Sequence, residues 1–159
     1  MTQIGTDAQA KNALQIIARC SDPKQLARIA DNALRLDQPT VRRAALLRLY
    51  AISPSAHPGT LEHDVWQSIF ALEGALKEER GKTILLSRTR QKIKRDGEHQ
   101  TVADLVLGNV SDGFRMLIDR GMPELTFEAV ALRHQNEFKE EVLSAADKRL
   151  REFAINFRN

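Results

Sequence analysis

Apolar side chains recur every three or four residues along nearly the whole chain, which is the spacing of one face of an α-helix. The clearest example lies near the C-terminus, where the recurring positions are Phe138, Val142, Ala146, Leu150, Phe153 and Phe157. Runs of β-branched residues alternating with polar ones, the pattern of a strand, do not occur. The sequence therefore predicts an all-α protein, a compact multi-helix bundle of about eight or nine helices with no sheet.

Three helices are predicted in the N-terminal third, and each has its own start signal. Thr6 begins a capping-box pattern (T-x-x-Q) before the first helix. Asp22 and Pro23 suit the N-cap and first position of the second helix, and Pro39 stands near the start of the third. These signals predict an N-terminal three-helix subdomain over residues 1–53.

The stretch PTVRRAALLRL, residues 39–49, resembles the second helix of a HEAT-type repeat, and NALQII and NALRLD repeat an Asn-Ala-Leu start. The resemblance spans about forty residues and implies stacked helical pairs. Because no sustained period follows, the sequence favours a compact bundle over a solenoid.

The clearest break in the chain is SPSAHPG, residues 53–59, which contains two prolines and a glycine. Thr60 follows as an N-cap, and the long helix after it is predicted to end at Gly81. The pattern predicts a C-terminal helical subdomain over residues 60–159, which contains a basic helix. One continuous domain is the alternative.

The composition is that of a globular protein, with 42% hydrophobic and 28% charged residues in 159. The single cysteine, Cys20, excludes an internal disulfide and suits a reducing compartment. The first residues lack the basic and apolar regions of a secretory signal, and no apolar run reaches the ~20 residues that span a bilayer. A cytoplasmic location without membrane association is therefore expected.

Motifs for catalysis or metal binding are not found. The histidines are His57, His63, His99 and His134, and their spacing is not that of a metal site. His63 lies between Glu62 and Asp64, but adjacent helical residues point about 100° apart, so we expect a solvated side chain in a first helical turn. Cys20 ends an amphipathic helix and is expected to be a buried structural thiol.

The stretch RGKT, residues 80–83, imitates the end of a phosphate-binding loop. A full loop needs a glycine five residues before Gly81, where Leu76 stands, and a preceding strand instead of a charged helix. Paired carboxylates such as Glu78 and Glu79 are predicted on helix surfaces. We therefore expect no enzymatic activity, no cofactor and no metal.

Residues 80–95 contain seven cations and no carboxylate, whereas the whole chain carries only +3, so the remaining residues sum to −4 (3 minus 7). The seven are candidate nucleic-acid-binding residues: Arg80, Lys82, Arg88, Arg90, Lys92, Lys94 and Arg95. On a helix over residues 84–95, Arg88, Lys92 and Arg95 fall within about 60° of one another. Like charges one turn apart repel, and phosphates would relieve that repulsion.

Several interpretations of this segment stay open. It is an ordinary solvated helix face, a surface for nucleic acid, or a surface for an acidic protein partner. A helix-turn-helix is disfavoured because the next helix, TVADLVLG, is apolar, so we expect contacts to the phosphate backbone with little base readout. Aromatic residues for base stacking are absent from the segment.

The predicted function is that of a non-enzymatic helical protein that binds nucleic acid through the basic helix at 80–95. The alternative is a helical protein–protein interaction or oligomerisation module without a nucleic-acid role, with the amphipathic helix 139–157 as the surface for a second copy. An enzyme with an unrecognised site is the third hypothesis.

The C-terminal half, from LSRTRQKIKRDG through GFRMLIDRGMPELTFEAVALRH, resembles a segment of uncharacterised bacterial proteins. The resemblance implies a bacterial source and helices that form one unit. It brings no activity and no functional residue with it.

Overall fold

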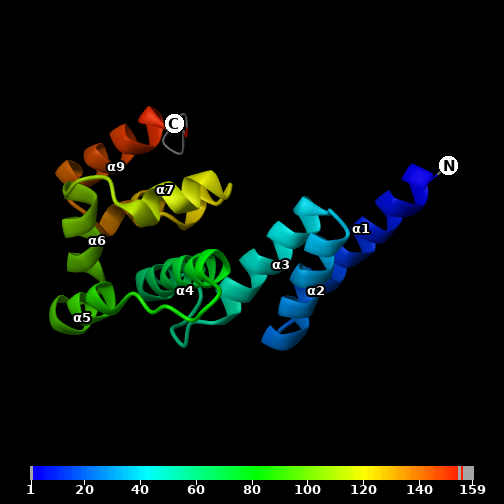
Figure 1. Cartoon of the computed structure of the whole chain (residues 1–159). Helices are drawn as coiled ribbons and strands as arrows, with labels where there is room; N and C mark the ends of the chain where they lie inside the picture. The colour runs from blue at the N-terminus through cyan, green and yellow to red at the C-terminus, as the bar shows by residue number, and fades with distance from the viewer. Residues whose placement is uncertain (1, 154, 156–159) are drawn as a thin grey trace. The chain divides into compact units, whose positions relative to one another are not determined.

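The computed structural model describes residues 2–153 and 155, with side chains described from residue 7 onward. Within this part the secondary structure consists of nine α-helices and two short 3-10 helices, without a strand (Figure 1). The all-α prediction is confirmed. No helix in the described ranges combines the length and the apolarity needed to cross a membrane.

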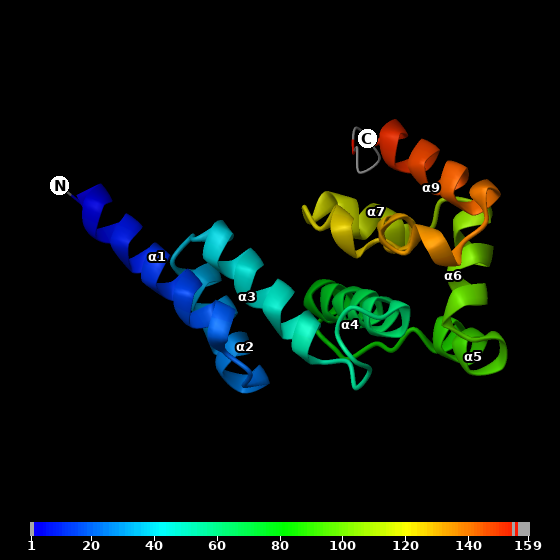
Figure 2. The ribbon, with the colours of Figure 1, turned by 180° about the vertical axis from the view of Figure 1, so that it is seen from behind.

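The chain divides into two compact units, residues 1–54 and 55–159, and each is described by itself. Unit 1 contains α1 (Thr2–Arg19), α2 (Pro23–Arg35) and α3 (Pro39–Ile52). Helices α2 and α3 pack along each other, and α1 packs on α3 (Figures 1 and 2). The buried residues of their core are Ile17, Cys20, Leu26, Ala30, Ala33, Val41 and Ala45.

The predicted start signals of α2 and α3 are confirmed. The side chain of Asp22 accepts a hydrogen bond from the Lys24 amide at 3.0 Å, and Pro23 is the first residue of α2. Pro39 likewise opens α3. Helix α1, however, begins at Thr2, so the predicted start at Thr6 is wrong, and the side chain of Thr6 lies outside the described residues.

Cys20 is buried, as predicted. Its Sγ lies 3.6 Å from Gln25 Oε1 and 3.6 Å from the carbonyl oxygen of Asp22. The Cys20 carbonyl oxygen accepts a hydrogen bond from Arg48 Nε at 2.9 Å, which joins the end of α1 to α3. Cys20 thus belongs to the packing of unit 1.

Unit 2 contains six α-helices and two 3-10 helices in its described part. They are α4 (Leu61–Arg80), α5 (Ser87–Asp96), α6 (Glu98–Leu107), α7 (Asp112–Asp119), η1 (Pro123–Leu125), α8 (Phe127–Arg133), η2 (Gln135–Glu137) and α9 (Glu140–Glu152). Helices α4, α6, α8 and α9 pack on one another around a core that includes Val65, Ile69, Val102, Val106, Val130 and Ala146. The predicted ends of α4 are confirmed: Thr60 caps its first turn, and Gly81 follows it with a left-handed φ of 70°.

Three local predictions in unit 2 need correction. His63, which was expected to be solvated, is only 5% exposed, and its Nδ1 lies 3.3 Å from Asp64 Oδ1. Helix α6 begins at Glu98, since Gly97 (φ 87°) turns the chain at once, and Thr101 is fully buried inside the helix. Helix α9 ends at Glu152, five residues before the predicted end at residue 157, which lies outside the described residues.

The apolar stripe of α9 is used within unit 2. Val142, Leu143, Ala146 and Leu150 are all buried, and α9 packs mainly on α8 and α6. The described part of this stripe is therefore covered by the chain's own helices.

Candidate nucleic-acid interface

The basic segment is not one helix. Arg80 is the last residue of α4, Lys82 lies in the connection between α4 and α5, and the other five cations stand on α5. Helix α5 starts at Ser87, so the prediction of a helix over residues 84–95 is wrong at its N-terminal end. Leu86 at the N-cap supplies no side-chain acceptor for the first turn.

Arg90 is tied down by a buried carboxylate. Its Nη2 and Nε donate to Glu73 Oε1 at 2.6 Å and Oε2 at 2.8 Å, and Glu73 on α4 is 8% exposed. The guanidinium also lies 5.2 Å from the ring centroid of Trp66 and 5.9 Å from that of Phe70. The hydrogen bond to Glu73 raises the pKa of Arg90. Arg90 thus anchors α5 to α4.

Glu73 also holds the chain just before α5. Its Oε2 accepts a hydrogen bond from the Leu86 amide at 2.8 Å, beside the bond from Arg90 Nε. A carboxylate that is buried needs such partners, because its desolvation is costly. The sequence pattern placed paired acids such as Glu78 and Glu79 on helix surfaces, and it did not single out Glu73 as a buried partner.

Lys92 is held between two carboxylates. Its Nζ lies 2.6 Å from Asp104 Oδ2 on α6 and 2.9 Å from Asp96 Oδ2 on α5. Hydrogen bonds to Asp104 and then Asp96 raise the pKa of Lys92. The charge of Lys92 is therefore compensated within the fold.

Arg95 pairs with its neighbour in sequence, with Nε 3.0 Å from Asp96 Oδ1, but its side chain is 70% exposed. The hydrogen bond from Arg95, followed by that from Lys92, lowers the pKa of Asp96 to about 2. Arg95 remains accessible to an anion even in this pair.

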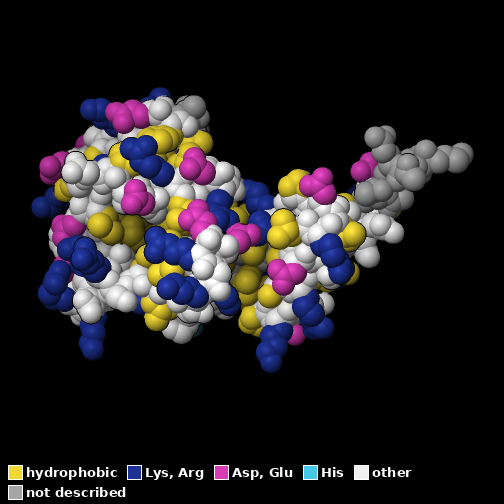
Figure 3. Space-filling view, in the orientation of Figure 1, with side chains coloured by type: hydrophobic (Ala, Val, Ile, Leu, Met, Phe, Trp, Pro, Cys, Tyr) yellow, Lys and Arg dark blue, Asp and Glu magenta, His cyan; other side chains and the backbone are white. Residues whose placement is uncertain are grey.

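The other four cations of the segment are exposed and form no ion pair with any residue that the structure describes. They are Arg80, Lys82, Arg88 and Lys94. Lys and Arg side chains gather over α5, at the lower left of the molecule in Figure 3.

The exposed face of α5 differs from the predicted ridge of Arg88, Lys92 and Arg95. Every exposed residue from 87 to 95 falls within an arc of about 120°, and these residues are Ser87, Arg88, Gln91, Lys94 and Arg95. Lys92 turns toward α6, and Ile93 is buried in the core. Lys94 thus takes the place of Lys92 in the outward set, and these five residues include no carboxylate.

A second polar cluster lies where α4 meets the end of α8. Asp64 Oδ2 is 2.7 Å from His134 Nε2 and 3.4 Å from Arg133 Nε, and Asp64 Oδ1 is 3.3 Å from His63 Nδ1. Burial acts to raise the pKa of Asp64, but the hydrogen bonds from His134 and His63 and the charge of Arg133 hold it below its usual value.

This cluster joins elements seventy residues apart in the chain, so no local pattern could reveal it. It has the character of a packing contact between α4 and α8. The described residues contain no group of three or more His, Cys, Asp or Glu side chains arranged to hold a metal ion.

A buried ion pair ties α8 to α9. Glu128 is 5% exposed and its Oε1 lies 2.7 Å from Arg149 Nη1, while Arg149 also donates to the carbonyl oxygens of Leu105 and Gly108. Burial raises the pKa of Glu128, and the hydrogen bond from Arg149 offsets this only in part. This pair was also missed at the sequence level.

Comparison with known proteins adds no assignment to this geometry: no protein-family model, no curated protein sequence and no solved structure matches the chain. The resemblances to HEAT repeats and to bacterial proteins stay expectations.

Proposed function

We propose that this chain is a non-enzymatic helical protein that binds nucleic acid through the phosphate backbone. The binding surface is the outward face of α5 with the segment that precedes it, and its cations are Arg80, Lys82, Arg88, Lys94 and Arg95. The observation that carries the proposal is the composition of the outward face of α5, which holds three cations and no carboxylate among its five residues.

Free cations favour phosphate binding for a simple energetic reason. Arg88 and Lys94 exchange only water and counterions for phosphate oxygens, and the release of those counterions drives binding. Arg90 and Lys92 would first have to leave Glu73 and Asp104. We therefore expect them to support the surface rather than to contact the ligand.

The buried face of α5 is held to the rest of unit 2 by packing and by an ion pair. Ile93 is 6% exposed in the core, and Arg90 reaches back to α4. Only Gly97 separates α5 from α6. The backbone of α5 is therefore held in place before binding, so that mainly side-chain entropy is lost at Arg88, Lys94 and Arg95.

The salt dependence of binding tests which cations take part. Five contacts predict a slope of log K against log [salt] of about −4 to −5 on duplex DNA, whereas seven predict about −6. Fluorescence anisotropy with a generic labelled duplex, repeated over a salt series, measures this slope. A matched RNA duplex in the same series distinguishes the type of nucleic acid.

The decisive variant is Arg88→Glu with Lys94→Glu, because both side chains are exposed and without an ion pair in the described structure. We expect it to remove binding at low salt without changing the thermal melt. The matched control is Lys11→Glu with Lys148→Glu, which changes the net charge equally at exposed positions elsewhere. If the two double variants bind equally, the α5 face is not the surface.

An acidic protein partner is the competing ligand for the same face. Polyglutamate of similar charge, added as a competitor, should displace the duplex only at much higher charge concentration. Displacement at equal charge would favour the acidic partner. Absence of duplex binding by the unaltered chain at low salt would overturn the proposal.

One observation favours the alternative function, a protein–protein interaction module. Leu34 is 58% exposed and Leu36 is 62% exposed at the C-terminal end of α2. Light scattering of the chain and of Leu34→Ser with Leu36→Ser tests it, because a change in oligomeric state would assign these leucines to an interface. The proposed homo-oligomer through residues 139–157 stays a prediction, tested by the same measurement.

A further inference from the structure

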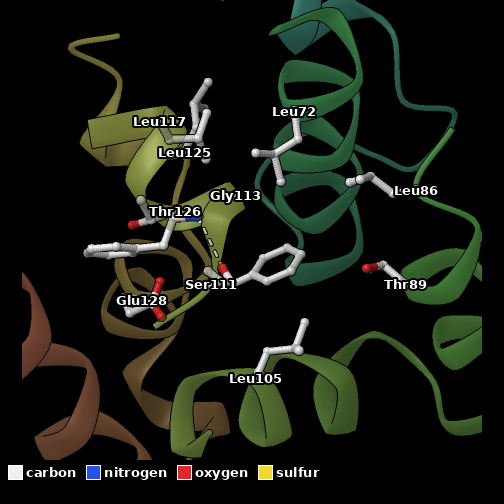
Figure 4. Close-up of a pocket in the computed structure, with 12 residues that line it drawn as sticks. Leu72, Leu86, Thr89, Leu105, Ser111, Gly113, Leu117, Leu125, Thr126 and Glu128 are labelled. Atoms are coloured by element: carbon white, nitrogen blue, oxygen red, sulfur yellow. Dashed lines mark hydrogen bonds between the residues drawn. The ribbon is translucent and has the colours of Figure 1, made fainter. Parts of the chain in front are cut away.

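Unit 2 contains a cavity of about 150 Å³ beneath the start of α5. Figure 4 shows Leu72 of α4 and Leu105 of α6 on its walls, with Leu86 and Thr89 on one side and Glu128 on the other. Side chains from the surrounding helices, among them Phe114 and Leu117 of α7, complete a lining that is mostly apolar. Such a space suits a small ligand with a large apolar surface.

The size of the cavity limits its occupant. An apolar cavity of about 150 Å³ accommodates a single six-membered ring such as benzene. Gly113 contributes to this space, since a Cβ at residue 113 would lie 3.2 Å from Leu72 Cδ2. A side chain there would compete with Leu72 for the same volume.

The polar groups of the cavity limit its chemistry. Ser111 Oγ accepts a hydrogen bond from the Phe114 amide at 3.1 Å, marked by a dashed line in Figure 4. Thr126 Oγ1 is engaged with Pro123 and Ala129. Among the described residues that line the cavity, Glu128 is the one with a charged group, and Arg149 at 2.7 Å compensates its charge.

A ligand ammonium group would meet the positive charge of Arg149 close behind the Glu128 carboxylate. A ligand carboxylate would meet Glu128 itself. An uncharged hydroxyl group avoids both repulsions and can donate a hydrogen bond to an ionised acceptor, which is stronger than one to a neutral acceptor.

We propose that this cavity binds a small uncharged aromatic molecule that carries one hydroxyl group, of the chemical class of phenol, with its ring among the leucines and its hydroxyl toward Glu128. This site is independent of the phosphate-binding surface, so either proposal can fail alone.

The test is a titration of the full chain with phenol, benzene and benzylamine, followed by amide chemical shifts in NMR spectra. We expect saturable shifts near residues 105, 114 and 125 with phenol, at a Kd of about 1 mM or tighter. Benzene should bind several-fold more weakly and benzylamine more weakly still.

Two variants locate the site. Leu105→Phe fills the cavity and should weaken phenol binding at least about tenfold, which corresponds to about 1.4 kcal/mol. Leu107→Phe is the matched control on the same helix, because Leu107 is 45% exposed and does not line this cavity. Gly113→Ala is a second filling variant: its Cβ would lie 3.2 Å from Leu72 Cδ2, so the Leu72 side chain must shift by a few tenths of an ångström, and its thermal melt is measured beside phenol binding.

Glu128→Gln tests the polar contact. It should reduce the preference for phenol over benzene while benzene binding is retained. Absence of saturable shifts up to the solubility limit of each compound, or equal binding by Leu105→Phe and Leu107→Phe, would overturn the proposal. Preference for benzylamine over phenol would overturn the assignment of an uncharged ligand.

Discussion

Arg90 of α5 and Glu73 of α4 form a two-pronged ion pair, with Nη2–Oε1 and Nε–Oε2 distances of 2.6 and 2.8 Å. The acid is nearly buried, whereas 31% of the base is exposed. Because of this pair, Arg90 contributes to the packing of α5 on α4, whereas Arg88 and Lys94 of the same basic segment stay exposed.

Arg90→Met should destabilise unit 2 because it leaves the Glu73 carboxylate buried, with the Leu86 amide as its one remaining donor among the described residues. Removing one partner from a fully buried pair costs about 3–5 kcal/mol, and the partial exposure of Arg90 reduces our expectation to about 2 kcal/mol. Urea denaturation measures the change in free energy of unfolding.

Arg88→Met is the control for this experiment, since Arg88 is exposed and has no ion pair in the described structure. It should stay within about 0.5 kcal/mol of the unaltered chain. Adding Glu73→Leu to Arg90→Met should recover much of the lost stability. If both single variants at 88 and 90 behave alike, the pair does not stabilise the unit.

Lys94→Gln should weaken duplex DNA binding more than Lys92→Gln. Lys94 is exposed and unpaired in the described structure, whereas Lys92 lies between Asp96 and Asp104. Loss of one phosphate contact should reduce the size of the salt slope by about 0.9 for Lys94→Gln and leave it unchanged for Lys92→Gln. The two variants have the same net charge. An equal effect on DNA binding would therefore contradict the proposal that Lys94 contacts phosphate and that Lys92 only supports the helix.

Stability should fall as the pH drops below about 4, because the hydrogen bonds from His134 and His63 hold the folded-state pKa of Asp64 below its ordinary value. A lowered pKa means that the unfolded chain binds the proton first, so this contribution is complete above the unfolded pKa and is lost as pH falls through the folded one. Asp96, with a pKa of about 2, adds to the loss in the same direction.

Asp64→Asn should therefore flatten the acid limb of the stability curve, measured as thermal midpoints of unit 2 between pH 5 and about 2. Glu152→Gln at the exposed end of α9 is the comparison. An unchanged acid limb in Asp64→Asn would show that the contacts with His63 and His134 do not depend on the charge of Asp64.

Asp37→Gly should stabilise unit 1. Asp37, in the turn between α2 and α3, has a φ of 53°, the left-handed region that costs a non-glycine residue about 1–2 kcal/mol. The added flexibility of glycine in the unfolded chain offsets part of this gain, so we expect about 0.5 kcal/mol. Asp31→Gly, within α2, should instead lower the stability by a few tenths of a kcal/mol.

The fold could be predicted because helix signals are local. Asp22, Thr60 and Ser111 each cap the helix that follows them, and the bond from the cap to the chain spans two or three residues. The apolar periodicity then identifies which face is buried. A glycine such as Gly81 marks the end of a helix through its own backbone geometry.

The sequence could locate the candidate site in the basic segment 80–95, but it could not identify which of the seven cations are exposed and which are paired. Whether a cation is free depends on acids distant in sequence: Glu73 lies 17 residues from Arg90, and Asp104 lies 12 from Lys92. The contact between Asp64, the neighbour of the buried His63, and His134 likewise joins residues that lie 70 apart in the sequence. Spacing along one helix carries no information about such partners.

The double use of Glu73 has a consequence for motion. The Glu73 carboxylate accepts hydrogen bonds from both the Leu86 amide and the Arg90 side chain. The connection after α4 and the first turns of α5 are therefore attached to α4 through the same carboxylate. Local opening should then release residues 82–92 together rather than one amide at a time, as a small cooperative unit in native-state hydrogen exchange. A ligand bound across this segment would slow that exchange over its whole length.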